Sequence, residues 1–137
     1  MKPEHAERTA RWLALGAGAL DFGTGLGLVL RPALVLRLMG AGAVAGEALV
    51  YLRWVGAFVG AVGCSYLWAW LRRDRHLLRA ALELTIGFRL AAGGYSAWAI
   101  ATGGLPPVWL SVPLVDFALA GGQAWLLRQW PGSRQTP

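Results

Sequence analysis

Long apolar stretches separated by short polar segments dominate the pattern of this chain. No Asp, Glu, Lys or Arg occurs in residues 54–71 or in residues 90–115. A helix that crosses a bilayer needs about 20 mostly apolar residues to span roughly 30 Å of hydrocarbon. A helix of a soluble bundle would carry a polar stripe along one side, and these stretches carry none. The pattern therefore predicts an all-α integral membrane protein.

Turn-forming residues divide the chain, residues 1–137, into four predicted spans of one four-helix bundle. The first stretch follows Glu4 and Glu7 and is interrupted by Asp21, so we expect a retained span and not a cleaved signal peptide. A basic turn is predicted over residues 72–79 and a tight Gly- and Pro-rich turn over residues 102–107. The spans cover about residues 12–30, 48–71, 80–101 and 108–127.

A short helix is predicted between the first two spans. Pro32 disfavours the helical conformation at Arg31, which ends the first span, and is itself well suited to open a new helix. The segment that follows is mostly apolar with Arg37 on one side, which is typical of a helix lying in the membrane interface. Residues 40–47 form a Gly-rich connector.

The basic residues predict the orientation. Only 15% of residues are charged, and the net charge is +6. The bases gather at span ends and form no basic face, so no nucleic-acid partner is expected. Nine lie on the side of both termini and three on the other, which predicts cytoplasmic termini. The nine are Lys2, Arg8, Arg11, Arg72, Arg73, Arg75, Arg79, Arg128 and Arg134, and the three are Arg31, Arg37 and Arg53.

Tryptophans and small residues agree with this layout. Trp rings favour the headgroup level, and eight of them fall near predicted span ends, Trp130 among them. Membrane helices associate through small residues at four-residue spacing. The candidates are Ala19, Gly23 and Gly27; Gly56, Gly60 and Cys64; Gly87 with Ala91; Gly93 with Ala97; and Ala118 with Gly122.

Three ionisable residues, Asp21, Arg89 and Asp116, fall near mid-depth of the first, third and fourth spans. Each charge at a span centre costs about 2.5 to 3.5 kcal/mol, so the three are expected to face inward and to meet. Each shares a helical face with small or polar residues. These are Ala14, Gly18 and Gly25 for Asp21; Thr85, Gly93 and Ser96 for Arg89; and Ala120 and Gln123 for Asp116.

We therefore expect a mid-membrane cluster of Asp21, Arg89 and Asp116 with Thr85, Ser96 and Gln123 as supporting polar groups. One guanidinium facing two carboxylates leaves a formal negative charge. The cluster could fix which helices pack together, relay protons in transport, or form a ligand or lipid site.

The remaining titratable residues suggest no catalytic set. Glu83 lies one turn from Arg79 and is expected to pair with it. His5 and His76 are far apart in polar segments, so neither a metal nor another cofactor is expected. Tyr66 is interpreted as a boundary or core aromatic residue.

The layout resembles the DoxX-like group of small bacterial four-span proteins. The likeness rests on the Asp in the first span, on a second span that opens "YLRWVGAFVGAVGCSYLWAW" and on the "LPP" turn before the fourth. It implies a bacterial inner-membrane location and a role as membrane subunit or accessory factor, and it carries over no catalytic residue.

The sequence thus favours a non-catalytic subunit or scaffold of a larger inner-membrane complex, in contact with lipids and with protein partners or further copies of itself. The alternatives are a small homo-oligomeric transporter, or a lipid- or quinone-binding protein or membrane enzyme built on the polar centre.

Overall fold

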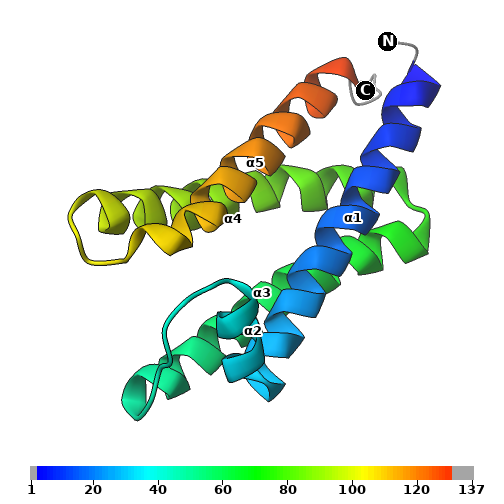
Figure 1. Ribbon diagram of the computed structural model, residues 1–137. Coiled ribbons are helices and arrows are strands. Elements are labelled where there is room, and N and C mark those ends of the chain that lie inside the picture. The colour runs from blue at the N-terminus through cyan, green and yellow to red at the C-terminus, as the bar shows by residue number, and fades with distance from the viewer. Residues whose placement is uncertain (1–2, 131–137) are drawn as a thin grey trace.

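The computed structural model describes residues 3–130, and this part of the chain is helical without strands (Figure 1). The all-α prediction is confirmed. The elements are α1 (Pro3–Leu30), α2 (Pro32–Leu38), α3 (Glu47–Arg72), α4 (Arg75–Ala101), the 3-10 helix η1 (Pro107–Leu110) and α5 (Ser111–Gln129). Lys2 and Arg134, which entered the count of bases, lie outside the described residues.

The helices extend beyond the predicted spans at their polar ends. Helix α1 begins at Pro3 instead of near Trp12. Glu4 lies in its first turn, where a negative charge stabilises the helix by interacting with the helix dipole. The predicted basic turn over residues 72–79 is right only for residues 73 and 74, because α3 includes Arg72 and α4 already begins at Arg75. Asp74 causes this early start: its Oδ1 accepts hydrogen bonds from the backbone N–H of His76 at 2.8 Å and of Leu77 at 3.2 Å.

The predicted short helix after the first span is present as α2. Pro32 occupies its first turn, and Pro32 and Leu36 are buried. Residues 40–46 connect it to α3, and residues 102–106 form the turn before η1.

Two helix pairs make up the structure. Helix α1 packs along α3, and α4 packs along α5, while contacts between the pairs are less extensive (Figure 1). Glycine residues permit the close packing of α1 against α3, because a Cβ atom added to Gly25 would lie 2.3 Å from the backbone nitrogen of Gly60. A Cβ atom added to Gly63 would lie 2.3 Å from the backbone nitrogen of Phe22. The backbones of α1 and α3 therefore lie too close together for any side chain at Gly25 or Gly63.

The small-residue prediction is right for some positions and wrong for others. Gly56 is buried against α1, whereas Gly63 takes the place predicted for Cys64, which is exposed. On α1, Gly23 has no neighbour and Ala19 is exposed, because Gly18 and Gly25 face α3 instead. Exposed positions also include Gly87, Ala91 and Ala118, whereas Gly93 is buried against α5.

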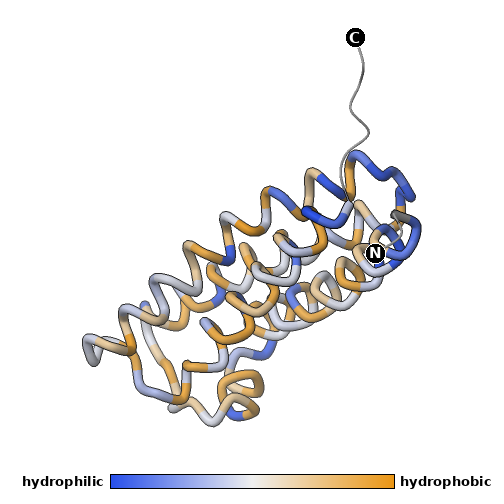
Figure 2. Tube along the Cα trace, turned by 90° about the horizontal axis from the view of Figure 1, so that it is seen from above, coloured by the Kyte–Doolittle hydropathy of each residue, from blue (hydrophilic) through white to orange (hydrophobic). Residues whose placement is uncertain are grey.

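One end of the molecule gathers polar residues around a compact apolar core. Figure 2 shows hydrophilic residues concentrated near the start of α1, the α3–α4 turn and the end of α5. Arg75 pairs with Glu7 at 2.9 Å, and Arg11 donates to the backbone carbonyl of Trp70 at 3.0 Å. Trp130, predicted at a lipid boundary, is instead buried in this core. The core includes Ala6, Ala10, Ala14, Tyr66, Ala69, Leu78, Leu82, Leu126 and Leu127.

The outside of the structure is strongly apolar. Three helical segments are long and apolar enough to cross a membrane: Glu4–Leu30, Glu47–Arg72 and Pro107–Gln129. In the most apolar 18-residue segment of α3, only 11% is buried. The side chains of Trp54 and Phe58 on this helix are 62% and 58% exposed. A surface of this kind fits a lipid environment, since soluble proteins rarely expose large contiguous apolar patches.

Candidate functional site

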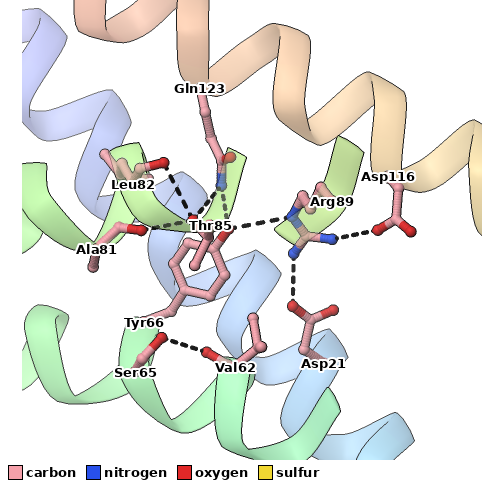
Figure 3. Close-up of polar contacts among 10 residues, drawn as sticks. All are labelled: Asp21, Val62, Ser65, Tyr66, Ala81, Leu82, Thr85, Arg89, Asp116 and Gln123. Carbon is pink, nitrogen blue, oxygen red and sulfur yellow. Dashed lines mark hydrogen bonds and ion pairs between the residues drawn. The ribbon is translucent and has the colours of Figure 1, made fainter. Parts of the chain in front are cut away.

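Arg89 joins two carboxylates at the centre of the structure (Figure 3). Its Nη2 lies 2.6 Å from Oδ2 of Asp21 on α1, and its Nη1 lies 2.9 Å from Oδ1 of Asp116 on α5. Both contacts have the geometry of charge-assisted hydrogen bonds. The structure thus brings together the three charged residues that the sequence places at one depth, each from a different helix.

Small residues allow the three helices to approach this point. Asp21 lies on the face of α1 that buries Ala14, Gly18 and Gly25 against the rest of the protein. On α4, a Cβ atom added to Gly93 would lie 3.1 Å from the Cβ of Asp116. Gly93 therefore lets α5 come close enough for Asp116 to reach the guanidinium.

Tyr66 of α3 is a member of the cluster that the sequence analysis missed. Its hydroxyl accepts a hydrogen bond from Nε of Arg89 at 3.2 Å and another from Nε2 of Gln123. The ring is fully buried, and the guanidinium carbon of Arg89 lies 5.6 Å from its centroid. A signal existed, because Tyr66 lies three residues after Gly63 and continues the α1-facing stripe of α3. With Tyr66, all four long helices contribute to the cluster.

Gln123 and Thr85 extend the network toward the polar end. The Thr85 hydroxyl contacts the carbonyl of Ala81 at 2.7 Å, and Nε2 of Gln123 lies 3.5 Å from the same hydroxyl. Gln123 is fully buried, and its Oε1 has no hydrogen-bond partner among the described residues. Ser96, the third predicted supporting residue, is only half buried, and its side chain makes no hydrogen bond within residues 3–130.

The charge balance of the cluster is uneven. Arginine side chains remain protonated in proteins, so Arg89 carries a positive charge. Each of its three side-chain nitrogens donates to one oxygen, on Tyr66, Asp116 or Asp21. The Arg89 side chain is 5% exposed, whereas those of Asp21 and Asp116 are 13% and 14% exposed. Each carboxylate keeps one oxygen that Arg89 does not contact, so a proton or a cation could offset the remaining negative charge there.

Other charged side chains form contacts near the ends of the helices. The predicted Arg79–Glu83 pair is confirmed at 2.8 Å, and Arg79 also donates to the backbone carbonyl of Trp130. Within residues 3–130, no three His, Cys, Asp or Glu side chains gather in a group that could hold a metal ion.

Comparisons with protein-family models, with curated proteins and with solved structures give no match for this chain. The DoxX-like resemblance rests on the layout of the sequence alone. The function therefore rests on the geometry of the cluster and on the surface of the helices.

Proposed function

We propose that this protein is a four-span protein of the bacterial inner membrane that serves as a non-catalytic subunit or scaffold of a larger membrane complex. In this proposal α1, α3, α4 and α5 cross the bilayer, both termini are cytoplasmic, and α2 lies at the outer interface. The charged cluster fastens the two helix pairs to each other, and an outward face of α4 receives a helix of a partner.

The assignment of α4 as a membrane span, the third in chain order, rests on the partners of Arg89. Helix α4 has 27 residues, which at about 1.5 Å per residue exceeds the hydrocarbon thickness. Its hydropathy is lowered by Arg75, Arg79 and Glu83 at the polar end and by Arg89 in the middle. Because Arg89 faces two carboxylates and is buried, its charge adds no unpaired charge to the lipid-facing surface.

The outward face of α4 is the observation that carries the subunit role. Positions spaced by three and four residues along this face are small apart from Leu84 and Trp98, and all are exposed except half-buried Gly94. We call this face the α4 seam, and it consists of Ala80, Leu84, Gly87, Ala91, Gly94, Trp98 and Ala101. The spacing is that of a helix surface that packs against another helix.

The α4 seam carries fewer large side chains than the outward face of α3, which supports a helix contact there. The outward face of α3 carries the large side chains of Trp54, Phe58 and Trp68, which fit lipid contact. A Cβ atom added to Gly87 or Gly94 would meet no atom of another element within 4 Å in the part of the chain that the structure describes. At Gly25 and Gly63, which are buried, glycine admits the backbone of another helix. The α4 seam is rich in small residues like the contact between α1 and α3, but no helix of residues 3–130 packs against it.

The experiment is purification from native membranes in mild detergent with a C-terminal tag, followed by identification of the proteins that co-elute. A larger partner in fixed stoichiometry is the expected result. Elution of the chain alone, as a monomer or as a homo-oligomer, would contradict the subunit role.

The excess carboxylate of the cluster favours a second function, cation- or proton-coupled transport by a homo-oligomer. Asp21 and Asp116 share one guanidinium, so one carboxylate equivalent is free to exchange a proton or a cation. This function predicts cation or proton flux in liposomes that Asp21→Asn and Asp116→Asn each abolish without loss of assembly. In the subunit role, the same substitutions weaken the helix contacts and no flux is seen.

A further inference from the structure

A hollow of about 630 Å³ lies at the end of the molecule opposite the polar end, between the end of α1, helix α2, the connector and the start of α3. Three arginines line it, Arg31, Arg37 and Arg53, and the remaining lining residues are apolar or glycine. No acidic residue lines it. Three positive charges over apolar walls are the chemistry of a site for an anionic group attached to an apolar chain.

The hollow is built by the local structure of α2. Pro32 and Leu36 are buried and hold α2 against the other helices, while Arg37 on the same short helix stays exposed. A Cβ atom added to Gly27 would lie 2.7 Å from Cγ2 of Val35, so glycine at this position lets α2 fold back onto α1. The fold-back brings Arg31 and Arg37 to the hollow that Arg53 of α3 also lines.

The three arginines have no acidic partner among the residues that the structure describes. Within residues 3–130 none of them is in an ion pair, whereas Arg75, Arg79 and Arg89 all are. Bases in this position attract anions, and guanidinium groups match the oxygens of phosphate in paired hydrogen bonds.

We propose that this hollow binds a phosphate group, and that its apolar walls favour a phosphate carried by an anionic lipid at the outer membrane interface. The Leu30, Leu34 and Leu49 side chains supply apolar surface for the first part of an acyl chain, and the arginines hold the headgroup. The inference is independent of the subunit role. It depends on the proposed membrane embedding only for the position of the hollow at the interface.

The test uses the purified full chain in mild non-ionic detergent and three probes: phosphatidylglycerol, phosphatidylcholine and inorganic phosphate. Native mass spectrometry and the thermal unfolding midpoint report binding. We expect phosphatidylglycerol to be retained over phosphatidylcholine and to raise the midpoint. The variant Arg31→Gln/Arg37→Gln/Arg53→Gln is expected to bind it at least about tenfold more weakly, since each base near a membrane surface adds to the attraction of anions.

Two further variants control this result. Arg8→Gln/Arg73→Gln/Arg128→Gln removes three exposed arginines from the rest of the chain and is expected to bind like the wild type. Ala43→Glu places a carboxylate in the hollow, keeps all three arginines, and is expected to weaken binding as well. If inorganic phosphate binds as tightly as phosphatidylglycerol and displaces it, the ligand is free phosphate. Equal retention of the two lipids, or unchanged binding in the triple variant of the hollow, would overturn the proposal.

Discussion

Arg89 of α4 donates a hydrogen bond from Nη2 to Oδ2 of Asp21 on α1 at 2.6 Å, which joins the two helix pairs at the centre of the protein. A second donor of the same guanidinium reaches Asp116 at 2.9 Å. These contacts link α1 to α4 and α5, whereas Tyr66 links α3 to the same arginine. A single side chain is thus the common partner of residues on the three other long helices.

The loss of Arg89 is expected to destabilise the fold strongly. Arg89→Met leaves Asp21 and Asp116 buried without a cation, and removal of one partner of a buried ion pair costs about 3–5 kcal/mol. Thermal unfolding in mild detergent measures the effect. The neutral variant Asp21→Asn/Arg89→Met/Asp116→Asn should recover part of the loss, and Arg128→Met at an exposed position serves as control. Unfolding of Arg89→Met at the wild-type temperature would show that the cluster does not fasten the helices.

Two glycines of α1 are expected to differ sharply in their tolerance of alanine. Gly25→Ala forces its methyl group against the backbone of Gly60, and overpacking of this kind costs about 1–3 kcal/mol. Gly23→Ala meets no atom within 4 Å and should be neutral or stabilising, by up to about 1 kcal/mol. The unfolding temperatures of the two variants test the α1–α3 packing. Equal values would contradict it.

The cap of α4 predicts a pH dependence of stability. Hydrogen bonds from the backbone N–H groups of Leu77 and His76 lower the pKa of Asp74. A carboxyl group whose pKa is lower in the folded state contributes stability above its unfolded pKa of about 3.9, and loses it as the pH falls through the folded value. We therefore expect Asp74→Ala to unfold at a lower temperature than the wild type near neutral pH.

This difference should shrink once the pH falls below about 4. Asp74→Asn keeps an acceptor that does not titrate, so its cap should be independent of pH. Unfolding temperatures of the three proteins across the acidic range measure the effect. If the difference in unfolding temperature between the wild type and Asp74→Ala stayed constant throughout the acidic range, even below the pKa of Asp74 in the folded protein, the result would argue against the cap.

The four-span topology predicts opposite sides for the two ends of α4. In a Cys64→Ala background, Thr102→Cys should react with a membrane-impermeant maleimide on intact cells. His76→Cys should react only after the membrane is opened. A helix lying on the membrane surface would place both positions on one side, so equal labelling of the two variants in intact cells would reject α4 as a span.

The sequence was most informative where charge is costly. The depth of Asp21, Arg89 and Asp116 along their helices was sufficient to predict a common location, because lipid leaves unpaired charges no inexpensive alternative. Tyr66 carries no charge, so depth alone did not single it out. Ser96 shares the helical face of Arg89 but lies beyond Gly93, where the neighbouring side chains no longer form the network.

Helix registers and ends were harder to predict. Small residues occur on several faces of each helix, and only the structure shows that Gly18 and Gly25, and not Gly23, meet α3. The start of α4 was misplaced because the charges of residues 72–79 suggested a turn, whereas Asp74 forms a cap there. Polar residues beyond the end of an apolar span can still be helical, and hydropathy alone does not reveal this.

The α4 seam is the feature on which the proposed function depends most, and substitution within it is the most direct test. Gly87→Leu/Gly94→Leu fills the seam, and because an added Cβ atom at either position lies in open space, we expect the protein to fold normally. Ala118→Leu/Gly121→Leu, at exposed positions of α5, is the matched control. We predict that the seam variant loses the co-purifying partner while the control retains it. Equal retention of the partner by both variants would contradict the assignment of the α4 seam as the partner surface.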